Sequence, residues 1–201
     1  SALHTDSSYR FERGIDAKIL PKAMCAVVGY LESEFSVVLA RSVDGKFIVY
    51  PTIKNSHNSG ILEFSSITYE DISSLDSHYI NLTKRIANEL NYIGVMAVEW
   101  FVAEGNIFVN EIAPRPHNSG HFTMDGANVS QFEQLIRAIS NLDLGDVSYV
   151  REGYMKNLIG DDILGLKVYE KDKNSKIHLY GKKEARHGRK MGHVNILKEN
   201  E

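Results

Sequence analysis

The sequence is poor in cysteine, has no long apolar run and carries no excess of positive charge. Its one cysteine, Cys25, excludes an internal disulfide framework and a zinc site built from several cysteines, and it fits a reducing, cytoplasmic compartment. No stretch of about eighteen consecutive apolar residues is present, so no membrane span is predicted. The formal net charge of -3 argues against general binding to nucleic acid or to an anionic membrane, because such proteins carry a broad positive surface.

The composition is that of a soluble globular protein, with 43% hydrophobic and 24% charged residues. The first sixteen residues are polar and lack the apolar centre of a signal peptide, so we expect an irregular segment over residues 1–22. No internal repeat and no low-complexity tract divides the remainder.

Apolar runs and turn residues predict the strands. We expect strands over residues 24–31, 35–41 and 46–50, with Asp44 and Gly45 as a hairpin turn and a polar loop from Pro51 to Gly60. Further strands are expected over residues 95–102 and 107–112, and short ones over 155–159, 176–180 and 193–197.

Two segments have the three- and four-residue apolar spacing of an amphipathic helix. They cover residues 71–92 and 130–141, and each places its apolar residues on one face. A loop rich in proline, glycine, asparagine and serine is expected over residues 114–128. Together these elements predict an α+β fold with mainly antiparallel pairing.

The feature that points most directly to chemistry is a pair of glutamates on neighbouring strands. If Glu104, Gly105 and Asn106 form a three-residue turn, Ala103 pairs with Ile107, Val102 with Phe108, and Glu99 with Glu111. Two facing carboxylates repel each other, and a bound cation removes that repulsion. Magnesium prefers hard oxygen ligands and commonly binds one or two carboxylates together with substrate phosphates.

The spacing leaves another interpretation open for these glutamates. Both could point to solvent, and a two-residue turn would shift the register by one and separate them. Alternation favours burial, because Glu99 shares a strand face with Val95, Ala97 and Phe101.

The loop after Glu111 and a basic segment near the end of the chain are candidate anion-binding regions. Pro114 and Pro116 stiffen the backbone around Arg115, whose planar guanidinium suits a phosphate group. The basic segment includes Lys182, Arg189 and Lys190, with glycines that allow close backbone approach. Taken separately, a surface turn and a solvated basic face are the more common explanations of these two regions.

Other chemistries are not indicated. The histidines show no metal-ligand spacing, which argues against zinc, and no serine nucleophile signature or Walker-type phosphate loop is present.

Several segments together resemble one family, the bacterial-type carboxyaminoimidazole ribonucleotide synthases of the ATP-grasp superfamily. They are GVMAVEWF (94–101), VNEIAPRPHNSGHFT (109–123), SQFEQLIRAISNLDLG (130–145), MKNLIGDD (155–162), HLYGK (178–182) and GRKMGHVNIL (188–197). The string NEIAPRPHNSGH is the most specific, and weaker matches cover residues 33–42 and 50–62. The resemblance implies an ATP-grasp domain over residues 23–145 and a small β-rich domain over residues 146–201.

The resemblance also implies roles for individual residues. Glu99 and Glu111 would hold magnesium at the ATP phosphates, and ATP contacts would come from Glu34, His57, Asn110 and Glu111. Catalytic and substrate contacts would come from Arg115, His117, Asn118 and Ser119, and substrate phosphate contacts from Lys182, Arg189 and Lys190. The implied reaction is the ATP-dependent carboxylation of 5-aminoimidazole ribonucleotide with bicarbonate through carboxyphosphate, in purine biosynthesis, by a cytoplasmic homodimer.

Members of that family are about twice as long, with an N-terminal α/β domain and a lysine-bearing lid. They usually carry glutamate where this sequence has Ala26 and an acidic residue where it has Lys54. We therefore expect this sequence to correspond to the C-terminal half of such an enzyme. Two alternatives are a formate-dependent glycinamide ribonucleotide transformylase, which shares a PRPH-type loop, and a non-catalytic module that retains the fold.

Overall fold

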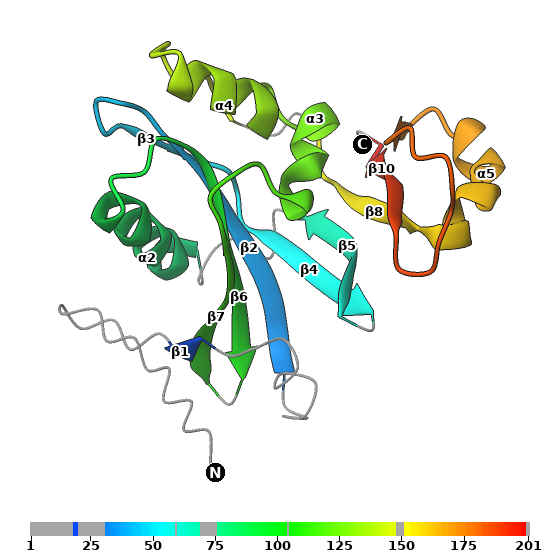
Figure 1. The fold of residues 1–201 in the computed structure, drawn as a ribbon, viewed down its shortest axis with the longest axis horizontal. Helices are drawn as coiled ribbons and strands as arrows, with labels where there is room; N and C mark the ends of the chain where they lie inside the picture. The colour runs from blue at the N-terminus through cyan, green and yellow to red at the C-terminus, as the bar shows by residue number, and fades with distance from the viewer. Residues whose placement is uncertain are drawn as a thin grey trace.

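The computed structural model describes residues 18–19, 31–58, 60–68, 76–103, 105–147 and 151–199, and the main feature of this part is one large sheet. The sheet has 10 strands in the order β1-β7-β6-β2-β4-β5-β8-β10-β9, with β3 paired to β2 (Figure 1). Neighbouring strands are antiparallel except for the parallel pair of β1 and β7. The strands are β1 Lys18–Ile19, β2 Leu31–Arg41, β3 Phe47–Val49, β4 Ile53–Asn58, β5 Ile61–Ile67, β6 Gly94–Ala103, β7 Asn106–Ala113, β8 Gly153–Ile159, β9 Ser175–Leu179 and β10 Lys190–Leu197.

Helices cover both faces of the sheet around β2 and β6, as Figure 1 shows. Helix α2 lies on one face, and α4 with the turns before it lies on the other. The helices are α2 Asp76–Glu89, α3 Thr123–Gly126, α4 Gln131–Ile139 and α5 Lys167–Glu170, with 3-10 turns η2 Asn118–Phe122 and η3 Gly160–Gly165.

This two-sided cover explains why β2 is apolar at consecutive positions. Successive strand residues point to opposite faces. Val37 and Leu39 pack with Tyr79 and Ile86 of α2. Val38, the residue between them, packs in a separate core on the opposite face, together with Phe122 of η2 and with Leu135 of α4 against it. An apolar run of this kind predicts a fully buried central strand, which is what the structure shows.

The prediction of a loop over residues 51–60 is wrong, because residues 53–58 form β4, which pairs with β2 and β5. The strand escaped detection because one of its buried positions is polar. Asn55 is buried, donates to Ser36 Oγ at 2.6 Å and accepts from Ser65 Oγ at 2.9 Å. A buried amide with partners on both neighbouring strands replaces the apolar side chain that would reveal the alternation.

The other predicted elements agree with the structure to within a few residues where the structure describes them. The predicted strand over 24–31 lies outside the described residues except for Leu31, which begins β2. The first predicted helix appears as α2, while its first residues, 71–75, lie outside the described part. Within the segment predicted as a loop, residues 118–126 form η2 and α3.

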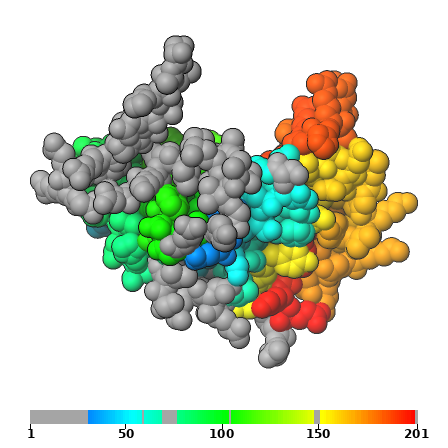
Figure 2. Space-filling model, turned by 90° about the horizontal axis from the view of Figure 1, so that it is seen from below, coloured from blue at the N-terminus to red at the C-terminus, as the bar shows by residue number. Residues whose placement is uncertain are grey.

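The C-terminal strands continue the same sheet. Strand β8 pairs with β5 through four residue pairs, from Phe64 with Lys156 to Ile67 with Gly153. In Figure 2 the segment coloured yellow to red forms one end of the molecule. A domain boundary near residue 146 remains a prediction. Among the described helices, none has the length and apolar character needed to cross a membrane.

Candidate active site

The two glutamates face each other, although the turn between their strands is not the one expected. Ala103 pairs with Asn106 and Val102 with Ile107, so two residues connect the strands, and the expected pairs of Ala103 with Ile107 and Val102 with Phe108 are wrong. A register shift between Glu99 and Trp100 then adds one residue, Asn110, to β7. This β-bulge restores the pair of Glu99 and Glu111 that the short turn alone would separate.

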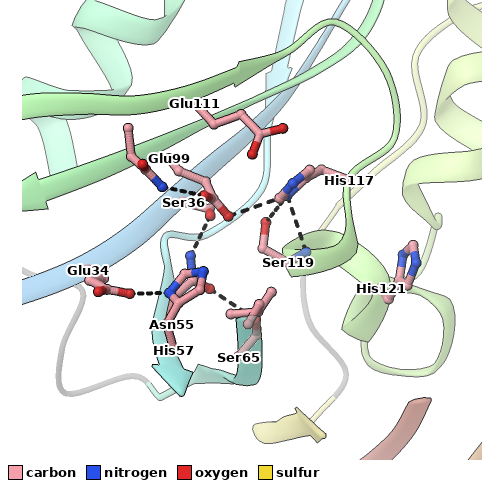
Figure 3. Close-up of polar contacts among 12 residues, drawn as sticks. Glu34, Ser36, Asn55, His57, Ser65, Glu99, Glu111, His117, Ser119 and His121 are labelled. Atoms are coloured by element: carbon pink, nitrogen blue, oxygen red, sulfur yellow. Dashed lines mark hydrogen bonds and ion pairs between the residues drawn. The ribbon is translucent and has the colours of Figure 1, made fainter. Parts of the chain in front are cut away.

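The bulge also brings the Asn110 amide to the Glu99 carboxylate. Its Nδ2 donates to Glu99 Oε2 at 2.8 Å, while its Oδ1 is buried without a hydrogen-bond partner among the described residues. Glu99 is only 3% exposed, whereas the side chain of Glu111 is 32% exposed. Figure 3 shows both carboxylates on the side of the hairpin that faces His117. A buried anion next to a second anion requires compensation by positive charge.

These oxygen atoms fit the magnesium ion that the ATP-grasp resemblance implies. Glu99 and Glu111 offer carboxylate oxygens from facing positions on β6 and β7, and both residues line the same cavity. Magnesium binds such oxygens and leaves its other positions to water and phosphate. No cluster of three or more histidine, cysteine or acidic side chains with metal-binding geometry occurs within the described ranges.

The loop after β7 turns back over the glutamates. His117 is 7% exposed, and its Nδ1 lies 2.9 Å from Ser119 Oγ and 3.8 Å from Glu99 Oε1. Arg115 extends outward, with its side chain 61% exposed and its Nη2 3.8 Å from Glu111 Oε1. The side-chain nitrogen of Asn118, Nδ2, is buried and has no hydrogen-bond partner in the part of the chain described. The loop therefore places the His117 imidazole and the Asn118 amide in the same cavity as the carboxylates, with the Arg115 guanidinium at its exposed edge.

A cavity of about 580 Å³ joins these groups to the basic segment. It is lined by His57, Gly60, Ile61, Leu62, Glu99, Glu111, Arg115, Pro116, His117, Asn118, His121, Tyr180, Lys182, Gly188 and Lys190. The cavity thus has carboxylates at one wall and lysines at another, as a site for a cation and a phosphorylated ligand requires.

Four of the residues named from the sequence do not line this cavity. The carboxylate of Glu34 is hydrogen-bonded to Nδ1 of His57, so it fixes the ring of a residue that does line the cavity. Asn110 and Ser119 support Glu99 and His117 in the same way. Arg189 donates instead to the carbonyl oxygen of Glu184, 3.1 Å away.

Tyr180 was not named from the sequence, although it lines the cavity. The Lys182 ammonium lies 5.5 Å from the centre of its ring and also donates to the Lys190 carbonyl oxygen. Burial raises the pKa of Tyr180 to about 12, so the phenol stays protonated and can donate to His193 Nδ1 at 2.9 Å. The pairing of β9 with β10 creates this arrangement, and spacing along the chain does not reveal it.

His121, which also lines the cavity, belongs to a histidine cluster. Its ring centre lies 4.9 Å from that of His193, which stacks on His178 at 4.6 Å. Burial lowers the pKa of His121 to about 4 and that of His193 to about 3. His178 is held by Asp125 at 2.7 Å.

Comparison with known families assigns the fold. The ATP-grasp domain family matches residues 23–132, and the phosphoribosylaminoimidazole carboxylase C-terminal domain matches residues 153–201. The chain belongs to the ATP-grasp family. The resemblance found in the sequence, and the α+β fold with a mainly antiparallel sheet, are therefore confirmed.

Among curated proteins, the chain is similar to N5-carboxyaminoimidazole ribonucleotide synthases. It is 40% identical over 192 residues to that of Bacillus subtilis, covering 92% of this chain and 50% of the relative. With the Vibrio parahaemolyticus enzyme it shares 45% identity over 163 residues, which are 81% of this chain and 42% of the relative. The chain thus spans about half the length of the curated relatives it matches.

Solved structures of the same group of ATP-grasp proteins have the same fold. An ADP complex of an N5-carboxyaminoimidazole ribonucleotide synthetase superposes with a TM-score of 0.77 at 44% identity, covering 85% of this chain and 46% of the other. An Aspergillus clavatus N5-carboxyaminoimidazole synthase, in complex with ADP and 5-aminoimidazole ribonucleotide, gives 0.71 at 30% identity and covers 84% and 48%.

Proposed function

We propose that this chain provides the magnesium and ribonucleotide side of an ATP-dependent carboxylase site acting on 5-aminoimidazole ribonucleotide. The observation that carries the proposal is the pair of Glu99 and Glu111, which face each other at the wall of a cavity that also contains lysines and Arg115. The names of the relatives, and the ligands named for the Aspergillus clavatus structure, support this substrate.

In this proposal the carboxylate wall binds the nucleotide phosphates through magnesium. Glu99, fixed by the amide of Asn110, and Glu111 would hold the ion, which when bound neutralises charge on the phosphoryl group being transferred. His57, fixed by Glu34, would contact ATP from the β4–β5 side of the cavity.

The lysines of the cavity and the loop after β7 bind the sugar phosphate of the substrate. Lys182 and Lys190 provide positive charge, and Arg115 adds a fork suited to phosphate oxygens. The buried Nδ2 of Asn118 is a donor that a bound ligand would satisfy. His117 would orient the reacting amine, with its ring held by Ser119. Arg189 would join the phosphate contacts only after leaving the Glu184 carbonyl oxygen.

The reaction follows the chemistry implied by the family resemblance. The γ-phosphoryl group of ATP is transferred to bicarbonate, which gives ADP and carboxyphosphate. The exocyclic amine of the aminoimidazole then attacks the carboxyl carbon, or the carbon dioxide released from it, and phosphate leaves. Exclusion of water from the cavity protects this short-lived intermediate. The proposal includes a cytoplasmic location and a homodimer, as the resemblance implies.

A chimera tests the activity. In it, this chain replaces the matching half of the Bacillus subtilis relative, to which it is 40% identical. We expect ATP turnover that requires both aminoimidazole ribonucleotide and bicarbonate, and a loss of at least about 100-fold with Glu111→Gln. Product formation with formate and glycinamide ribonucleotide would instead favour the transformylase alternative. A soluble, folded chimera inactive with both substrate pairs would favour a non-catalytic module.

A further inference from the structure

Gln131, the first residue of α4, is a fully buried side chain that holds the loop lining the cavity. Its amide contacts the backbone of His117 twice: His117 N donates to Oε1 at 2.9 Å, and Nε2 donates to His117 O at 2.7 Å. The same Nε2 lies 2.9 Å from Nδ1 of His121. One amide therefore connects the backbone at one cavity residue with the ring of another.

The direction of these bonds fixes the state of the His121 ring. A backbone N–H can only donate, so the atom of Gln131 that faces His117 N must be the oxygen. The other atom is then the NH₂ group, which donates its two hydrogens to His117 O and to His121 Nδ1. A ring nitrogen that accepts a hydrogen bond carries no proton, so the proton of neutral His121 is on Nε2.

We propose that His121 is a further ligand-binding residue of the cavity, which Gln131 positions as a neutral donor with its hydrogen on Nε2. The ligand atom would be an oxygen that accepts a hydrogen bond, on a phosphate or a carboxylate group. This proposal rests on the proposed function for the kind of ligand, whereas the state of the ring does not depend on it.

The surroundings of His121 also disfavour its charged form. Desolvation of the half-buried ring lowers its pKa to about 4. Positive groups on several elements oppose its protonation further, and Asp125 lies in the same cluster, bonded to His178. The titratable and charged groups around the ring are Arg115, His117, Asp125, His178, Tyr180, Lys190 and His193.

At this position a neutral N–H can donate a hydrogen bond to a ligand without adding positive charge to the cavity. The cavity already contains Arg115, Lys182 and Lys190, so another cation would add repulsion between the walls. A neutral N–H still provides a directed hydrogen bond to a ligand oxygen, and it does so throughout the neutral pH range. A ring free to take up a proton on Nδ1 would lose the Gln131 bond, and with it the fixed orientation of Nε2–H.

The test is nitrogen NMR of the chain labelled at its histidine rings, recorded as a function of pH. In the unaltered chain we expect His121 to show an unprotonated Nδ1 and a protonated Nε2, with no titration above about pH 5. In Gln131→Glu the carboxylate favours a proton on Nδ1, so the midpoint of the His121 titration rises by more than about one pH unit.

Gln134→Glu is the matched control. Gln134 is also fully buried on α4, and its side chain also makes two hydrogen bonds to the backbone of one residue, Gly145. Its replacement by glutamate should therefore destabilise the chain to a similar extent without changing a contact to a histidine. A protonated Nδ1 on His121 in the unaltered chain would overturn the proposal, even if Gln131→Glu does not fold. Identical His121 spectra for the two variants would overturn the role of Gln131. A His121 Nε2 signal that does not shift when inorganic phosphate is added to the unaltered chain would overturn the role of His121 in binding. Failure of the chimera to turn over ATP would contradict the proposed function and leave the ring assignment standing.

Discussion

Glu99 and Glu111 lie opposite each other across β6 and β7 because the extra residue Asn110 compensates for a two-residue turn. The same residue places its amide against Glu99, with Nδ2 2.8 Å from Oε2. The bulge therefore sets both the register of the two carboxylates and the hydrogen bond that fixes Glu99. Bulges commonly re-aim side chains next to functional sites, and this one has a consequence for stability that can be measured.

Without metal, the facing carboxylates should destabilise the chain. We expect Glu111→Gln to raise the free energy of unfolding in EDTA by up to about 1 kcal/mol, because it removes a like charge opposite Glu99. Magnesium should stabilise the unaltered chain and have little effect on the variant. Urea denaturation with and without magnesium measures both effects. A variant less stable than the parent in EDTA would show that other groups already offset the repulsion between the two carboxylates without metal.

The buried amide of β4 should be a stability determinant. Asn55→Ala leaves the hydroxyls of Ser36 and Ser65 buried without this partner, so a loss of about 1–3 kcal/mol is expected. Lys54→Ala, at the exposed neighbouring position, should change stability by no more than about 0.5 kcal/mol. Equal effects of the two variants in chemical denaturation would contradict the role assigned to Asn55.

The close contact between η2 and α4 predicts that a single added methyl group lowers the stability of the fold. A Cβ at Gly120 would lie 2.7 Å from Gln131 Oε1, inside the contact distance, so Gly120→Ala should displace the amide and lower the melting temperature by several degrees. Gly165→Ala, in the other 3-10 turn, meets no atom within 4 Å and should be close to neutral. A melting temperature for Gly120→Ala equal to that of the parent would exclude this packing.

The lowered pKa values of His121 and His193 predict a loss of stability in acid. The pKa of His121 is lowered to about 4 and that of His193 to about 3, mainly by burial, whereas an unfolded histidine titrates near 6.5. Below pH 6.5 the unfolded chain thus binds more protons than the folded chain. Stability therefore falls as the pH is lowered from 6.5 toward the pKa values of the folded state. The slope approaches about 1.4 kcal/mol per pH unit for each proton.

Replacing one buried histidine should flatten this dependence. We expect His193→Gln to reduce the slope of the unfolding free energy between about pH 6 and pH 4, and His187→Gln, at an exposed position, to leave it unchanged. Urea denaturation at a series of pH values measures the slope. Parallel curves for His193→Gln and the parent would mean that His193 is not the residue that takes up the proton.

The sequence predicted the elements whose apolar pattern is strong. Strands β2, β6 and β7 and helix α4 were all expected, because burial on one or both faces leaves a periodic trace in the chain. Strand β4 was not, since Asn55 occupies a buried position through hydrogen bonds. The facing glutamates were predicted correctly through an incorrect turn, because nothing in the local sequence shows the bulge at Asn110.

Only the part of the cavity that is local in the sequence could be predicted. The loop from Arg115 to Ser119 is contiguous in the sequence, so its residues could be named together. His121, His178 and His193 come together only through the pairing of β9 with β10 and the packing of η2 and α3 against the sheet. Contacts of that kind depend on tertiary structure and leave no spacing signal.

The measurement that tests the central claim most directly is calorimetric titration of the chain with ADP, with and without magnesium, for the parent and for Glu111→Gln. The facing carboxylates predict ADP binding that requires magnesium and that weakens at least about tenfold in the variant. Binding of ADP with the same affinity in EDTA, and in Glu111→Gln, would contradict a nucleotide site built on these two side chains.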